Sequence, residues 1–227
     1  AGQAGQGGRE AWRAVTRLLS TLRQARAYRD FAALLACGLF YQAGVTVVIT
    51  LAAIYAQEVM KFDTLQTMIL IFAVNIMAAV GAFAFGYVQD ALGHRATLAL
   101  TLICWLVMVV LAAMATNAMM FWLAANLAGL AMGSSQSAGR AMVASLAPPE
   151  RSAEFFGLWT LAIQLAAVIG PLSYGATMAI TGNDHRLSFL LSGLYFLLSL
   201  PLIAVIDMER GQRVALGLVH TSQDSQA

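Results

Sequence analysis

The 227-residue chain is dominated by apolar side chains: 60% of its residues are hydrophobic and only 11% are charged. Its mean hydropathy is +0.74, whereas soluble domains carry roughly a quarter charged residues, so the composition predicts an integral membrane protein. The formal net charge of +2 is too small to favour nucleic acid as a partner.

The first thirty residues contain no predicted span. Residues 1–8 are a Gly-rich run typical of a flexible linker and lack a signal-peptide pattern. Because residue 1 is not methionine, we expect the natural chain to begin earlier. Residues 9–30 place Trp12, Val15, Leu19 and Leu22 at helical spacing among arginines. This pattern predicts a basic amphipathic cytoplasmic helix at an anionic membrane surface, or a solvated connector whose arginines fix the topology.

Six apolar segments are each long enough to cross about 30 Å of hydrocarbon. We expect spans at 31–57, 66–88, 97–116, 118–138, 155–181 and 187–206. The predicted fold class is therefore an all-α integral membrane domain of six transmembrane helices over residues 31–206.

The basic residues predict the orientation of these spans. Of the 13 Lys and Arg residues, only Lys61 and Arg186 fall on the side opposite the termini. Because the side rich in Lys and Arg faces the cytoplasm, we expect both termini there, with a plasma or inner membrane as the location. The polar residues 207–227 predict a disordered cytoplasmic tail.

Uncharged polar and small side chains form stripes along four of the spans. The first and fourth spans carry polar stripes, with Tyr41, Gln42, Thr46, Thr50, Asn126 and Gln136. We expect the small-residue stripes to form helix interfaces, with Asn75, Gly129, Gly133, Gln164, Gly170 and Pro171. The third and sixth spans are bulky and apolar and are expected to face lipid. Each stripe is also compatible with helix packing alone.

The stretch between the second and third spans has a distinctive spacing. It reads Gly-x-x-x-Asp-x-x-Gly-basic-basic and contains Gly86, Asp90, Gly93, His94 and Arg95. We expect a loop in which Gly86 allows close helix packing and Gly93 permits a tight turn. The pattern resembles the signature loop of the major facilitator superfamily of secondary transporters.

That resemblance implies a fold and a mechanism. It identifies the chain as the C-terminal six-helix half, two three-helix repeats, of a twelve-span transporter that works by rocking two halves around a central site. It also implies that the polar stripes of the first and fourth spans line a substrate cavity. The implied partners are the lipid bilayer, a small-molecule substrate, and an N-terminal six-helix half or a second copy of the chain. The signature loop would act as a latch that stabilises one access state.

The fourth and fifth spans and their connection carry a second, narrower pattern. It consists of Gly129, Gly133, Gln136, Arg140, Pro148, the run Glu154-Phe155-Phe156-Gly157, and Gly170-Pro171. This series resembles the autophagy-related vacuolar amino-acid effluxer family and its bacterial relatives. The resemblance implies efflux of an amino acid or a similar metabolite. We expect Arg140 and Glu154 to form a cytoplasmic charge pair.

Other function classes find less support in the sequence. Ser134 and Ser135 lie near Gly133 in a span, but no carboxylate or histidine lies well inside a span to act as a base for them. Cys37 and Cys104 fall in apolar segments, so they predict neither a disulfide nor a metal site. We therefore expect no enzyme activity, cofactor or metal. A non-transporting six-helix membrane scaffold or partner subunit is the alternative.

Overall fold

The computed structural model describes residues 28–217, and within this range the chain folds into seven α-helices and one 3₁₀ turn. In chain order these are α2 (Arg29–Glu58), α3 (Thr64–Leu92), α4 (His94–Met114), α5 (Ala118–Leu146), η1 (Pro149–Arg151), α6 (Ser152–Ile180), α7 (His185–Val205) and α8 (Met208–Ala215). Helices α2 to α7 are long and apolar enough to cross a membrane. The predicted all-α, six-span fold is confirmed.

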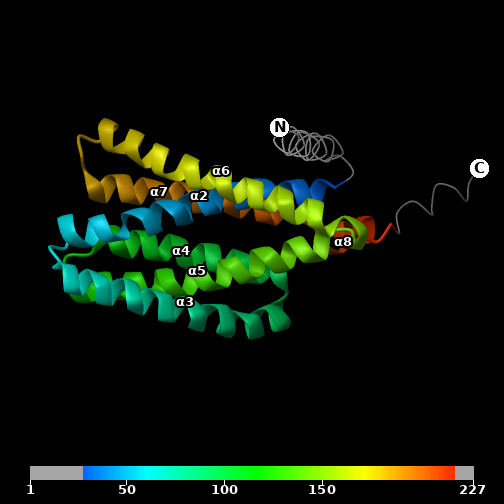
Figure 1. Ribbon diagram of the computed structural model, residues 1–227, viewed down its shortest axis with the longest axis horizontal. Helices are drawn as coiled ribbons and strands as arrows, with labels where there is room; N and C mark the ends of the chain where they lie inside the picture. The colour runs from blue at the N-terminus through cyan, green and yellow to red at the C-terminus, as the bar shows by residue number, and fades with distance from the viewer. Residues whose placement is uncertain (1–27, 218–227) are drawn as a thin grey trace, which may run out of the picture.

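The six long helices form two groups of three. Figure 1 shows α2, α6 and α7 along one side of the bundle and α3, α4 and α5 along the other. The closest packing within the groups joins α2 to α6 and α7, and α5 to α3 and α4, while α4 against α7 is the main contact between them. The groups therefore mix helices from the first and second halves of the domain.

Polar caps mark several helix starts. Asp63 accepts a hydrogen bond from the Gln66 backbone N–H at 2.7 Å, and the Gln66 side chain accepts one from the Asp63 N–H at 3.1 Å. Asn117 and Asp184 cap α5 and α7 in the same way through their side-chain oxygens. These caps satisfy backbone N–H groups that a helix start leaves without partners.

Aromatic side chains fill the centre of the bundle. The fully buried rings of Trp105 in α4 and Phe196 in α7 stack with centroids 5.1 Å apart and an interplanar angle of 3°. Toward one end, Tyr55 of α2 packs against Phe121 and Phe189. The third and sixth spans, α4 and α7, were expected to face lipid. That expectation is wrong for one side of each helix, because both helices contribute a stripe of buried residues to this core.

Glycines permit the closest helix crossings. A Cβ atom added at Gly129 would overlap the Val74 carbonyl oxygen, and one at Gly133 would overlap that of Ala78. Gly170 meets the Ala43 carbonyl oxygen of α2 in the same manner. The structure thus places all three glycines at helix interfaces within the chain, with α5 against α3 and α6 against α2.

Several boundaries differ from the prediction. Helix α3 continues through Gly86 and Asp90 to Leu92, so the expected loop shrinks to Gly93, whose φ is +82°. Helix α5 runs eight residues past the expected end of the fourth span. A 29-residue helix is about 43 Å long, more than the hydrocarbon requires, so hydropathy marks only the part within the lipid.

The C-terminal prediction also needs correction. Residues 208–215, expected to be disordered, form α8, which packs on α2 and α5. Its start is capped by Asp207, which accepts a hydrogen bond from the Arg210 N–H at 3.0 Å. The predicted linker 1–8, most of the amphipathic helix 9–30 and the end of the tail lie outside the described residues.

Candidate functional site

The predicted cavity residues of α2 fall into two environments. Tyr41 and Gln42 are buried, at 0% and 3% exposed. Tyr41 packs against Gly139 of α5 and Trp159 of α6, where a Cβ added at Gly139 would lie 2.6 Å from the Tyr41 hydroxyl oxygen. The Tyr41 hydroxyl and the Gln42 amide nitrogen have no hydrogen-bond partner within the described chain. Both therefore sit at a helix junction rather than on an open surface.

The remaining predicted cavity residues are more accessible. Thr50 is exposed, and Thr46, Asn126 and Gln136 are half-buried. Thr46 donates a hydrogen bond to the Gln42 carbonyl oxygen at 2.8 Å, and the Asn126 amide donates to the Trp122 carbonyl oxygen at 2.8 Å. These bonds to their own helices lower the cost of placing polar groups in a membrane span.

A cavity of about 250 Å³ opens between α2, α3, α4 and α5. Its lining is almost entirely apolar and includes Ile49, Val74 and Ala128, with polar atoms offered by Asn75, Tyr55 and Trp105. The Trp105 indole N–H is buried without a partner in the described part of the chain. None of the six predicted cavity residues lines this space. Tyr55 and Trp105 were not predicted to line a cavity, because single aromatic residues in apolar runs indicate packing, and Asn75 was predicted at a helix interface instead.

The signature residues differ in their surroundings. Gly93 takes the left-handed conformation that the tight turn requires. A Cβ added at Gly86 would meet nothing within 4 Å, so the expected close helix packing at this glycine does not occur within the described chain. Asp90 is exposed, and its carboxylate takes no part in the hydrogen bonds or salt bridges of residues 28–217. His94 is half-buried, with its Nδ1 atom lacking a partner in that same range.

Arg95 connects the signature turn to a distant helix end. Its guanidinium donates a 2.6 Å hydrogen bond to the carbonyl oxygen of Ala204, in the last turn of α7. That carbonyl is among those that a helix end leaves without an internal partner, and a cation is favoured there. The contact joins the α3–α4 turn to the C-terminus of the last span.

We expect Arg95→Met to loosen the end of α7 modestly. Because the side chain is exposed, water can replace part of the lost bond, and we expect the Tm in detergent to fall by only about 2 °C. Arg140→Met is the matched control, since Arg140 is exposed and makes no hydrogen bond within residues 28–217. Equal Tm values for the two variants would show that the Ala204 contact contributes nothing.

The predicted pair between Arg140 and Glu154 is wrong. Glu154 instead accepts from the neighbouring Arg151, with Nη2 to Oε2 at 2.7 Å and Nε to Oε2 at 3.0 Å. Arg151 lies three residues before Glu154, so the helical spacing brings the two charges together.

The predicted interface residues Asn75 and Gln164 are exposed, and Asn75 donates to the Ile71 carbonyl oxygen of its own helix at 2.8 Å. Pro171 lies inside α6 and is half-buried.

Only three residues of α3 are buried, namely Thr67, Leu70 and Gly81. Helix α3 therefore presents a broad apolar face that no other described helix covers, with Phe72, Phe83 and Tyr87 among its most exposed side chains.

No cluster of three or more His, Cys, Asp or Glu side chains that could hold a metal occurs in the described part of the chain. The side chains that line the cavities of the described chain can make hydrogen bonds and apolar contacts.

The amino-acid sequence matches a known protein family. A family model described as vacuole effluxer Atg22 like matches residues 6–216. The chain is 25% identical over 199 residues to the uncharacterized MFS-type transporter YxiO of Bacillus subtilis, covering 88% of this chain and 46% of that protein. It is also 25% identical over 206 residues to autophagy-related protein 22 of Candida glabrata, covering 86% of this chain and 38% of that protein. The chain thus spans less than half the length of these relatives.

Proposed function

Because the chain belongs to the Atg22-like vacuole effluxer family, a branch of the major-facilitator-type transporters, we propose that it forms one six-helix half of a membrane transporter for a small solute. In this proposal it is the C-terminal half of a twelve-span protein. The two halves rock around a central site to expose it alternately to each side of the membrane. No covalent chemistry on the solute is involved.

The observation that carries the proposal is the presence of accessible polar side chains within membrane spans. Thr46, Thr50, Asn126 and Gln136 are at least partly exposed in the described chain, although they lie in helices that can cross a membrane. Polar groups in spans usually face a bundle interior or a water-filled cavity rather than lipid. A second six-helix unit facing α2 and α5 would enclose such a cavity.

The uncovered face of α3 supports the need for a partner. Asn75, Gly86 and Asp90 are at least partly exposed on this helix, and the space beside Gly86 would let another helix approach closely. We propose that an N-terminal six-helix half, or a second copy of this chain, packs there.

The family description and the apolar cavity together favour a small organic solute. We propose an amino acid or similar metabolite, moved in the direction of efflux. The cavity beside Asn75 and Trp105 contains no charged lining residue, so it suits an uncharged part of such a solute. The basic end of the bundle, with α8 and Arg151, is proposed to face the cytoplasm.

Counterflow in vesicles tests the proposal. The protein that carries this chain is purified, reconstituted into vesicles preloaded with unlabelled amino acids, and supplied outside with a labelled mixture of the same amino acids. We expect labelled solute to accumulate transiently above the level of protein-free vesicles. No accumulation, together with a stable complex with another protein, would favour the scaffold alternative.

We expect Asp90→Ala to slow transport without destabilising the protein. The carboxylate has no partner within residues 28–217, so its loss leaves the described fold intact, and we assign its partner to the second half. A latch contact of about 1.4 kcal/mol would change the rate about tenfold. Initial counterflow rates and Tm values check this, with the exposed Glu209→Gln as the control acid at the same end. Unchanged rates in Asp90→Ala would exclude the latch.

A further inference from the structure

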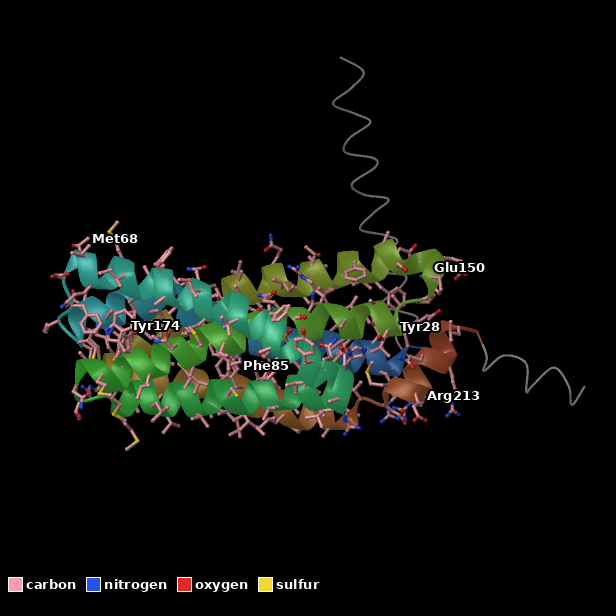
Figure 2. All side chains as sticks on the ribbon, turned by 90° about the horizontal axis from the view of Figure 1, so that it is seen from below. Tyr28, Met68, Phe85, Glu150, Tyr174 and Arg213 are labelled. Atoms are coloured by element: carbon pink, nitrogen blue, oxygen red, sulfur yellow. The ribbon has the colours of Figure 1, made fainter. Side chains whose placement is uncertain are left out.

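Two side-chain hydrogen bonds link the facing ends of α6 and α7 at the end of the bundle opposite α8. The Tyr174 hydroxyl lies 3.0 Å from His185 Nδ1, and the Thr181 hydroxyl lies 2.9 Å from that of Ser188. Tyr174 is 8% exposed, and His185 is half-buried at the first position of α7. Figure 2 shows Tyr174 toward the Met68 end of the bundle, with Tyr28, Glu150 and Arg213 at the other end.

A second cavity, of about 270 Å³, lies beside this pair between α2, α6 and α7. Six of its ten lining residues carry a hydroxyl group, namely Ser173, Tyr174, Thr177, Ser188, Ser192 and Tyr195. Tyr174 belongs to both features: its side chain lines the cavity and its hydroxyl contacts His185. A change in the imidazole can therefore reach the hydroxyl-lined space through one side chain.

The ionisable groups around His185 have other partners. The Asp184 carboxylate accepts from the backbone N–H groups of Arg186 and Leu187 at 2.9 and 3.0 Å. The Arg186 guanidinium points to the Ala113 carbonyl oxygen of α4 at 3.4 Å. Tyr55 of α2, which interacts electrostatically with Tyr174, donates to the Ala112 carbonyl oxygen at 3.0 Å. Of these groups, only a histidine ordinarily changes charge between about pH 5 and 8.

We propose that His185 and Tyr174 form a proton-binding site that sets how the end of α6 packs against α7. In the neutral tautomer with its hydrogen on Nε2, the Nδ1 atom accepts the Tyr174 hydroxyl hydrogen. When a proton from water binds Nδ1, that nitrogen donates to the Tyr174 oxygen instead. The Tyr174 hydroxyl hydrogen must then turn away from His185 toward another acceptor, such as water in the second cavity.

The two helices that this bond joins make few other contacts with each other. Helix α6 packs mainly on α2, where Tyr174 lies against Val47 and Leu51, and has far fewer contacts with α7. Pro171 lies inside α6 and removes one backbone hydrogen bond, so we expect the part of α6 after Pro171 to shift relative to α7 as its bond to His185 reverses. If the transport function proposed above holds, this site makes transport sensitive to the pH on that side of the membrane.

A fluorescent reporter on α6 tests the site without requiring transport. A bimane label is attached to Ala179→Cys, an exposed position near the end of α6, in the complete protein with Cys37 and Cys104 replaced by alanine. Bimane emission is compared at about pH 5 and about pH 8 in the parent, His185→Gln, Tyr174→Phe and His220→Gln proteins. His220 is the control, because it is a histidine outside both the described residues and the signature stretch.

We expect a pH-dependent emission change in the parent that is retained in His220→Gln and reduced at least about fivefold in both His185→Gln and Tyr174→Phe. A full response in His185→Gln, or an equal loss in His220→Gln, would overturn the proposal; size-exclusion profiles verify that each variant is folded. Counterflow of labelled amino acids at the two pH values is measured separately. A lost emission response in His185→Gln without any counterflow in the parent would support the proton site while refuting the transport function.

Discussion

Replacing Gly133 with leucine is expected to prevent stable folding of the six-helix domain. The Cα of Gly133 lies so close to α3 that even a single added Cβ would overlap the Ala78 carbonyl oxygen and lie 2.8 Å from the Ala82 backbone nitrogen. Both neighbours are backbone atoms, so no side-chain rotation can make room for the new atoms. Relief requires α3 and α5 to separate along their contact.

Separating α3 from α5 is expected to cost more free energy than the overlap at Gly133 alone. The α3–α5 contact is the most extensive helix pairing in the described bundle, and Gly129 and Gly81 form similar close approaches along it. Overpacking a well-packed interior costs about 1–3 kcal/mol, occasionally more, and even one carbon atom placed against backbone atoms belongs at the upper end. We expect the Tm to fall by about 6–12 °C for Gly133→Ala and no monodisperse protein for Gly133→Leu.

Gly175→Ala provides the matched control. Gly175 also lies inside a long helix, α6, but a Cβ added there meets nothing within 4 Å. Alanine is a better helix former than glycine by about 1 kcal/mol, so this variant is expected to be as stable as the parent or more stable. Thermal unfolding in detergent, followed by size-exclusion chromatography, compares the two. Similar Tm values for Gly133→Ala and Gly175→Ala would contradict the close crossing.

The sequence predicted one of the two faces that meet at the α3–α5 crossing. The Gly129–Gly133 spacing indicated a close helix contact, because small residues four apart share one face of a helix. The sequence could not indicate which face of α3 would meet it. From the sequence we assigned Asn75 and Gly86 on this helix to close packing without naming the helix they would meet, and the contacts with Gly129 and Gly133 of α5 use Val74 and Ala78. Both faces of α3 are apolar or small, so their periodicity cannot distinguish the chain's own interface from the uncovered face.

The partners of charged and polar side chains near the ends of the spans were predicted incompletely. We expected Arg140 to pair with Glu154, whereas the structure pairs Glu154 with Arg151, a partner three residues away that helical spacing already favours. Tyr174 and His185 sit across a tight turn, at Gly182 and Asn183, whose geometry decides that they meet.

The buried carboxylate of Asp30 provides the second large effect, because we expect Arg210→Met to release α8 from the bundle. Asp30 is 4% exposed and accepts hydrogen bonds from Arg210 Nη2 at 2.6 Å and Nε at 2.9 Å, and from the Asp207 backbone N–H at 2.9 Å. The hydrogen bond to Asp30 raises the pKa of Arg210. This bidentate contact joins the start of α2 to α8, which also packs on the end of α5 through Gly211 and Leu146.

Arg210 and Asp30 differ in how much of each side chain is exposed to solvent. Arg210 has a 46% exposed side chain, whereas that of Asp30 is 5% exposed. Removing Asp30 lets the guanidinium turn to water, so Asp30→Asn loses mainly the charge-assisted bonds and should cost about 1–2 kcal/mol. Removing Arg210 instead leaves a buried carboxylate without its cation, which is the more costly change. We therefore expect Arg210→Met to be the less stable of the two single variants.

A double-mutant cycle tests this asymmetry. In Asp30→Asn combined with Arg210→Met, no buried charge remains, so the double variant should be more stable than Arg210→Met alone. Arg213→Met is the control, because Arg213 pairs with Glu209 at 3.3 Å with both side chains largely exposed, and exposed pairs of this kind contribute little. Limited proteolysis near residue 207 and the Tm measure the docking of α8. If Asp30→Asn proves as damaging as Arg210→Met and the double variant is no better, the buried charge does not determine how α8 is held.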